Sequence, residues 1–143
     1  MPSESAKVNK TYSVVLEFDG LPEDEQNLVV FGNEELLFTA LRNIVLNACK
    51  YSKNQRAIIL LRANEKNIRA AVKNKGAGIP SHEFENIFQP FYRIEEDRTA
   101  GGFGLGLSLA KRIIKLHNGE ISLYSEPNGE TVFIVDLPSA QHL

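Results

Sequence analysis

Three side chains on one predicted helix have the types and spacing of a cation or phosphate site. Asn43, Asn47 and Lys50 stand at positions i, i+4 and i+7, so they form one line along the helix, at the border of its apolar stripe. Amide oxygens suit a hard divalent cation, and a lysine suits phosphate. A solvated polar edge would have the same pattern. This segment alone leaves both interpretations open.

Two glycine segments allow a ligand to approach the backbone. Residues 74–80, NKGAGIP, follow a strand-like run, and their two glycines also fit an ordinary loop. Residues 101–107, GGFGLGL, lead into an amphipathic helix, where a glycine costs about 1 kcal/mol relative to alanine. Backbone N–H groups at a helix N-terminus bind anions. The second segment therefore predicts a phosphate site, although it matches neither the dinucleotide fingerprint nor the P-loop.

An aromatic and charged stretch separates these glycine segments. Its aromatic residues are Phe84, Phe88, Phe91 and Tyr92. The i, i+4 spacing of Phe84 and Phe88 favours core packing over base stacking. The charged residues that follow, with Arg93 and Arg98, are typical of either a surface loop or a mobile lid over an anionic ligand.

Strands and helices in mixed order must position these segments. Asn33 predicts a helix start, because it is a good cap and Glu34 and Glu35 fill the first turn. The expected strands are 11–18, 28–31, 56–63, 67–74, 120–125 and 130–137, and the expected helices are 33–51, 81–88 and 104–117. Strands outnumber helices, which favours an α+β fold with helices on one face of a largely antiparallel sheet.

Composition narrows the class of protein. The chain has 143 residues, is 43% hydrophobic and carries a net charge of -2, as expected for one globular domain with a core. The near-neutral balance argues against a nucleic-acid binder. No apolar run is long enough for a signal peptide or a membrane span. The single cysteine, Cys49, points to a reducing compartment and, from its apolar neighbours, to a buried core position.

In this order, the segments resemble the ATP-binding domain of bacterial sensor histidine kinases, a fold shared with the gyrase, chaperone and mismatch-repair ATPases. The resemblance covers residues 11–138, which leaves 1–10 as a linker or disordered tail and 139–143 as a second tail. It implies a two-layer α/β sandwich. Its sheet would be five-stranded, mixed and mostly antiparallel, with three helices on one face.

The resemblance also implies a role for each candidate residue. Asn47 would bind the Mg²⁺ of Mg-ATP, Asn43 would support it, and Lys50 would contact phosphate; these three form the expected catalytic set. Tyr51 would lie near the adenine or ribose. Further nucleotide contacts would come from Asn74, Gly76, Gly78 and Ile79 at the base, and from Arg93, Gly102, Gly104, Leu105, Gly106 and Leu107 at the phosphates.

Two positions depart from the related proteins. In the related ATPases, a glutamate at position 43 activates water, whereas Asn43 cannot take a proton, so we expect poor hydrolysis. Most family members have an aspartate at position 74, which accepts a hydrogen bond from the adenine amino group. Asn74 can still accept, but it lacks the charge that strengthens such bonds.

The resemblance thus implies a protein histidine kinase catalytic domain that donates the γ-phosphoryl group of Mg-ATP to a histidine on a separate dimerisation domain. None of His82, His117 and His142 has the sequence context of the phosphoacceptor, so we do not expect the chain to phosphorylate itself. The full-length protein would be a homodimer with a downstream response regulator. It would be cytoplasmic, with or without an inner-membrane anchor outside this sequence. Two alternatives stay open: a degenerate module that serves as a partner-binding platform, and a serine kinase of the anti-sigma-factor type.

Overall fold

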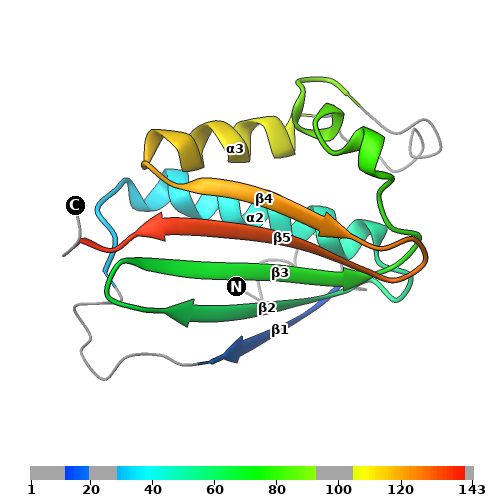
Figure 1. The fold of residues 1–143 in the computed structure, drawn as a ribbon, viewed down its shortest axis with the longest axis horizontal. Coiled ribbons are helices and arrows are strands. Elements are labelled where there is room, and N and C mark those ends of the chain that lie inside the picture. Colours follow the sequence, from blue (N-terminus) through cyan, green and yellow to red (C-terminus); the bar gives the residue numbers. More distant parts are fainter. Residues whose placement is uncertain (1–11, 20–28, 93–104, 141–143) are drawn as a thin grey trace.

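A five-stranded mixed sheet forms one layer of the protein (Figure 1). The computed structural model describes residues 12–19, 29–92 and 105–140. The strand order is β1-β2-β3-β5-β4; β1 pairs in parallel with β2, and every other neighbouring pair is antiparallel. The strands are β1 (Ser13–Phe18), β2 (Arg56–Ala63), β3 (Asn67–Lys75), β4 (Glu120–Ser125) and β5 (Glu130–Pro138).

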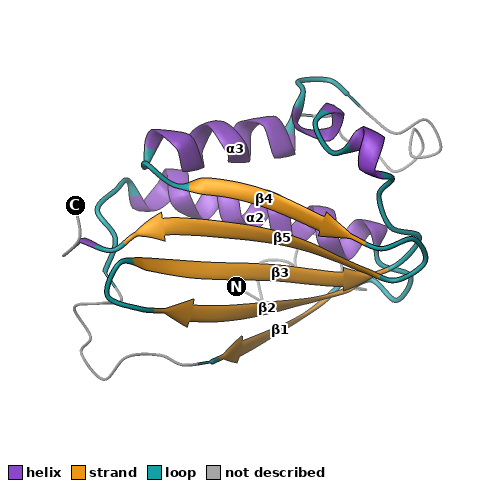
Figure 2. Cartoon of the chain, in the orientation of Figure 1, coloured by secondary structure: helices purple, strands orange, loops and turns teal. Residues whose placement is uncertain are grey.

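Helices cover one face of this sheet and form the second layer (Figures 1 and 2). They are α2 (Glu34–Tyr51), α3 (Gly106–Leu116) and a third helical region made of two 3₁₀ helices, η2 (Ser81–Glu83) and η3 (Asn86–Phe88). The predicted fold class is confirmed. The single helix expected over residues 81–88 is wrong in detail, because i→i+3 hydrogen bonds, such as Gln89 N–H to the Asn86 carbonyl, close two separate tight turns.

The ends of α2 and α3 are joined by specific contacts. The Asn33 side chain accepts a hydrogen bond from Leu36 N–H at 2.9 Å, which confirms the predicted cap. His117, the residue that caps the C-terminal end of α3, accepts the Asn33 N–H at Nε2 (3.0 Å). Its Nδ1 lies 2.7 Å from the Ile113 carbonyl oxygen. The imidazole therefore donates through Nδ1, accepts through Nε2, and holds the start of α2 against the end of α3.

The core lies between the helices and the covered face of the sheet. Alternation along β3 turns Ala70 and Val72 towards the helices, and Phe133 and Val135 of β5 do the same. Phe133 is the largest fully buried side chain and meets the ring of Phe88 edge-on at 6.2 Å. The helices contribute the apolar stripe Ala40, Ile44, Val45, Ala48, Cys49, Leu107, Ala110, Ile113 and Ile114. Cys49 has no exposed surface, which confirms its predicted core position.

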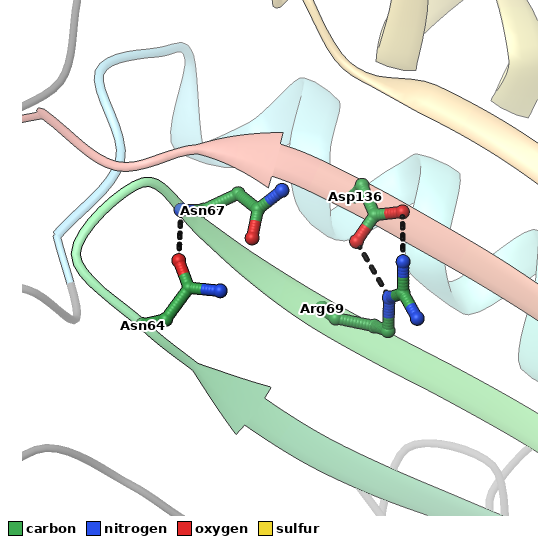
Figure 3. Close-up of polar contacts among 4 residues, drawn as sticks. All are labelled: Asn64, Asn67, Arg69 and Asp136. Carbon is green, nitrogen blue, oxygen red and sulfur yellow. Dashed lines mark hydrogen bonds and ion pairs between the residues drawn. The ribbon is translucent and has the colours of Figure 1, made fainter.

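The other face of the sheet carries a polar cross-strand pair near one end, close to a hydrogen bond within the turn between β2 and β3 (Figure 3). Arg69 of β3 makes a two-point ion pair with Asp136 of β5, with Nε–Oδ1 and Nη2–Oδ2 distances of 2.8 and 3.0 Å. The Asn64 side chain accepts the Asn67 N–H at 2.9 Å and closes the turn between β2 and β3. Both pairs lie at the end of β3 far from Lys75. The ion pair links β3 to β5, and both contacts lie away from the end of the sheet that carries the candidate site.

The expected strand at 28–31 is wrong for the residues that are described. Residues 29–31 have no strand geometry, and the side chains of Val29 and Phe31 are 50% and 65% exposed. This short run leads directly to the cap of α2, so it connects elements instead of joining the sheet. The Val29 carbonyl accepts a hydrogen bond from Ala140 N–H, after the end of β5. Within the described part of the chain, no helix combines the length and apolar character needed to cross a bilayer.

Candidate functional site

The line of polar residues on α2 meets the start of α3. A Cβ atom built on Gly106 would lie 3.7 Å from both Cβ and Cγ of Asn43, in ordinary contact. The first turn of α3 is therefore packed directly against the Asn43 side chain. Leu107 turns into the core while Leu105 stays 41% exposed. The structure thus brings together two segments that the sequence predicted for one site, although they lie about sixty residues apart.

Asn43 and Asn47 keep their side-chain amides available. Both residues are half-buried at the edge of the apolar stripe, as their spacing predicted. Neither side chain hydrogen-bonds to another residue in the described ranges. Neither amide is among the buried side-chain atoms that lack a partner in the described residues, so water or a ligand can reach both of them.

These amides fit the Mg²⁺ that the fold family implies. Mg²⁺ keeps several waters and is usually held by one or two protein oxygens together with substrate phosphates. A site of that kind needs no cluster of acidic ligands, and the described residues contain no group of three or more His, Cys, Asp or Glu side chains suited to a metal. Asn47, with Asn43 one turn away, supplies amide oxygens of the required type.

The loop after β3 lies against the C-terminal end of α2. Gly76 forms an isolated bridge with Ser52, the C-cap of α2, and a Cβ on Gly76 would collide with the Tyr51 carbonyl oxygen. Only glycine permits this close approach. On α2 itself, the Lys50 ammonium lies 5.3 Å from the centre of the Tyr51 ring. Lys50 and Tyr51 therefore lie at the end of α2 that meets the loop.

The same loop is attached on its other side to the turn between β4 and β5. Gly76 N–H donates to the Gly129 carbonyl at 3.1 Å, and Asn128 N–H donates to the Ala77 carbonyl at 3.0 Å. Gly78 has a φ of +83°, and a Cβ there would lie 2.5 Å from the Glu126 carbonyl oxygen. Ile79 N–H donates to the Ser125 hydroxyl at 2.9 Å. The loop predicted as a turn and a site is thus fixed between α2 and the hairpin.

A row of polar residues crosses the covered face of the sheet beneath this loop. Asn74 of β3 pairs with Thr131 of β5, which pairs in turn with Ser125 of β4. Asn74 is 7% exposed and Thr131 is 3% exposed. In the described part of the chain, the Asn74 side chain makes no hydrogen bond. The row begins where the apolar core ends, so it makes a polar floor beside the loop.

Sequence reasoning predicted Asn74 as a site residue but did not single out Ser125 or Thr131. A signal was present, since apolar Ile121 and Leu123 predict that the next residue on the covered face, Ser125, should also be apolar. Thr131 similarly precedes Phe133 on the buried side of β5. A polar residue that continues an apolar alternation marks the point where a strand leaves the core.

The predicted aromatic cluster divides into three environments. Phe88 packs in the core, with the Lys111 ammonium 5.1 Å from its ring centre, whereas Phe91 is 71% exposed. The Tyr92 hydroxyl donates to Glu83, and Asn86 donates to the other Glu83 oxygen. These hydrogen bonds, that of Tyr92 first, lower the pKa of the Glu83 carboxyl.

Three predicted site residues, Arg93, Gly102 and Gly104, lie outside the described residues. A shallow hollow of about 240 Å³ beside β3 is not the candidate site. Its lining includes Asn74 but otherwise consists mainly of residues such as Ile58 and Lys73, which alternation turns to the uncovered face of the sheet.

Comparisons with known proteins place this geometry in a family. Residues 32–141 match the family described as "Histidine kinase-, DNA gyrase B-, and HSP90-like ATPase". The sensor-like histidine kinase SenX3 of Mycolicibacterium smegmatis is 38% identical over 112 residues, which cover 76% of this chain and 29% of that protein. The adaptive-response sensory kinase SasA of Synechocystis sp. is 34% identical over 120 residues, which cover 82% and 31%. The chain therefore spans about three-tenths of the length of these relatives.

Solved structures agree with the sequence relatives. The catalytic domain of histidine kinase ThkA has a TM-score of 0.72 and 28% identity, with 96% of this chain and 90% of that chain covered. The mycobacterial sensor histidine kinase MprB has a TM-score of 0.76, with 95% and 89% covered. At 22% identity, MprB supports the fold alone.

Proposed function

The chain belongs to the histidine kinase-, DNA gyrase B- and HSP90-like ATPase family, and we propose that it binds Mg-ATP and donates the γ-phosphoryl group to a histidine on a separate dimerisation domain. Its relatives are sensor histidine kinases, and the chain corresponds to their ATPase domain. The proposal concerns the ligand, the direction of transfer and the acceptor.

The observation that carries this proposal is the packing of the start of α3 against the Asn43 side chain of α2. Gly106 begins α3 at ordinary contact distance from Asn43, so the helix N-terminus and the Asn43 side chain border the same space. Free N–H groups at that terminus favour the phosphates, and the amides favour the cation that accompanies them. A polyphosphate with a bound divalent cation satisfies both preferences.

The nucleotide would lie along α2, with its phosphates at Asn43 and its base near Asn74. From Asn43 to Tyr51 the helix rises roughly 12 Å, which separates the phosphate end of the site from the base end. The base end is the fixed loop of Gly76 and Gly78 together with the polar row that includes Asn74. An adenine ring would meet a polar edge at Asn74 and backbone without side chains at the glycines.

The chain's own residues favour holding ATP over hydrolysing it. Bound Mg²⁺ would neutralise charge on the phosphates, with Asn47 as its protein ligand and Asn43 as its support. Asn43 lies against the phosphate end but has no basic atom to accept a proton from water. Lys50, and Arg93 by resemblance, would add positive charge. The γ-phosphoryl group would then persist until a better nucleophile, the acceptor histidine, reaches it.

The partners follow from the same proposal. The chain matches only part of each relative, so the acceptor histidine, the dimer and the response regulator would lie in other domains or proteins. The three histidines of this chain have other contexts. His117, for example, uses both ring nitrogens between α3 and α2.

Titration with a fluorescent ATP analogue, with Mg²⁺ and then with excess EDTA, tests nucleotide binding. We expect saturable binding that weakens at least tenfold without the cation. Asn47→Ala should produce the same loss with Mg²⁺ present, whereas Asn67→Ala, on the far end of β3, should bind like the wild type. Absence of binding at millimolar nucleotide would refute the proposal and favour a degenerate partner-binding module.

Transfer from γ-labelled ATP to an added histidine-containing dimerisation domain of a sensor kinase tests the second half. Phosphohistidine loses its label in acid and phosphoserine does not. We therefore expect acid-labile label on the added domain and none on this chain. Acid-stable label on a protein substrate would instead support the serine-kinase alternative.

A further inference from the structure

We propose that Ser125 is a positioning residue for the base-binding loop, and this proposal rests on the function proposed above. Ser125 is the last residue of β4, more than forty positions from the loop in sequence. Its hydroxyl oxygen accepts the Ile79 N–H at 2.9 Å. The same oxygen lies 2.7 Å from the Thr131 hydroxyl oxygen.

This contact is the part of the loop's attachment to the hairpin that depends on a side-chain hydrogen bond. The other links between the loop and the hairpin, at Gly76 and Ala77, are hydrogen bonds from backbone to backbone. Among the described residues, Ser125 supplies the one side-chain hydrogen bond to the backbone of residues 76–80. Replacement of a single hydroxyl therefore separates this attachment from the others.

The position of Ser125 connects the loop to the floor of the site. Ser125 and Thr131 are paired across β4 and β5, and Thr131 is paired with Asn74 across β5 and β3. Thr131 is 3% exposed, so its hydroxyl is fixed inside the protein. Ser125 thereby fixes the distance between the backbone of Ile79 and the polar row that contains Asn74. Binding of a base between the loop and this polar row depends on that distance, whereas binding of phosphates at Gly106 does not.

Ser125→Ala tests this inference against two ligands, Mg-ATP and Mg-tripolyphosphate. Loss of one hydrogen bond that orders the loop should weaken ATP binding by about fivefold to tenfold. Tripolyphosphate has no base, so its affinity should stay within about twofold. Ser125→Thr keeps the hydroxyl and should restore ATP affinity. Ser122→Ala, an exposed position on the other face of β4, is the matched control and should bind both ligands normally.

Amide hydrogen exchange at Ile79 provides a readout without nucleotide. In the wild type this N–H is hydrogen-bonded, and in Ser125→Ala we expect exchange about tenfold faster, with the Gly76 N–H unchanged. Thr131→Val serves if Ser125→Ala does not fold. It keeps the Ile79 bond but removes the hydroxyl that fixes Ser125, so it should speed Ile79 exchange to a smaller degree.

The outcomes separate this inference from the proposed function. A wild type that binds no ATP contradicts the proposed function and removes the nucleotide role of Ser125. If the wild type binds ATP but Ser125→Ala binds it equally well, only the positioning role is wrong. Equal losses for ATP and tripolyphosphate would also overturn it, because they would show a general disturbance of the fold.

Discussion

Replacement of Asn74 by aspartate should raise affinity for ATP and lower the stability of the free protein. Asn74 lies on the covered face of β3, beside the loop that begins at Gly76, and its side chain makes no hydrogen bond among the described residues. A neutral acceptor there would gain about 1 kcal/mol from the adenine amino group, and a carboxylate about twice that. The difference of about 1 kcal/mol corresponds to roughly fivefold tighter binding of ATP.

The same substitution has a cost when no nucleotide is bound. Position 74 is 7% exposed and Thr131 beside it is 3% exposed, so a carboxylate would lose much of its hydration. We expect a decrease of about 1–2 kcal/mol in the free energy of unfolding of the free protein. Affinity and stability should therefore change in opposite directions, which distinguishes this effect from a general tightening of the fold.

GTP supplies the specificity test. Guanine has a carbonyl oxygen where adenine has its amino group, and the Asn74 amide can turn its NH₂ towards that oxygen. A carboxylate can only repel it. The ratio of ATP to GTP affinity should thus increase at least tenfold in Asn74→Asp, by the same charge argument.

Calorimetric titration of both nucleotides, with urea unfolding of the free proteins, measures all three quantities. Asn67→Asp is the matched control, because it lies on the same strand roughly 23 Å away and should leave both affinities unchanged. ATP affinities of wild type and Asn74→Asp within twofold of each other would refute the reasoning. So would an equal gain for GTP.

Three further predictions concern the loop, the core and the chemistry. Gly78→Ala should lower the free energy of unfolding, measured by urea titration, by at least about 2 kcal/mol. The reason is that φ at this position is +83° and the new Cβ would lie 2.5 Å from the Glu126 carbonyl oxygen. Gly129→Ala, whose new Cβ has its nearest contact at 3.4 Å, should lower it by about 1 kcal/mol or less. Burial raises the pKa of the Cys49 thiol to about 11, so the unfolded chain loses that proton at a lower pH than the folded protein. The free energy of unfolding should therefore fall by roughly 2 kcal/mol between pH 9 and 11, and Cys49→Ala should lack this component. Asn43→Glu should raise ATP hydrolysis about a hundredfold, measured as phosphate release, whereas Asn43→Gln should not; equal rates would contradict the absence of a base at Asn43.

Local sequence signals predicted most elements of the fold. The cap at Asn33 and the apolar period that follows set both ends of α2, and alternating residues predicted both hairpins. Signals of this kind act over one turn or two neighbouring residues. The strand expected at residues 28–31 was wrong for residues 29–31 because these residues individually favour strands. Their path is set instead by α2, which begins shortly after them in the chain.

Long-range pairings account for what the sequence did not reveal. The contact of His117 with Asn33 joins residues 84 positions apart, and Asn74 pairs with Thr131 across two strands that are far apart in the chain. Periodicity shows which side chains share a face but not which strand lies beside another. The site residues of α2 and the loop were therefore predicted individually, whereas the polar row of Asn74, Thr131 and Ser125 could be recognised only from the strand order.

The place of β5 in the sheet has a consequence for biosynthesis. β5 comes last in sequence but lies between β3 and β4, so neither of these strands has its full set of hydrogen bonds until β5 arrives. A nascent chain that ends near Gly129 would expose two open strand edges and an uncovered apolar layer, with Phe133 missing from its centre. We expect chains truncated within β5 to aggregate, while loss of the edge strand β1 should be tolerated better. Ribosome-bound chains of increasing length should accordingly resist protease only after Pro138 has emerged.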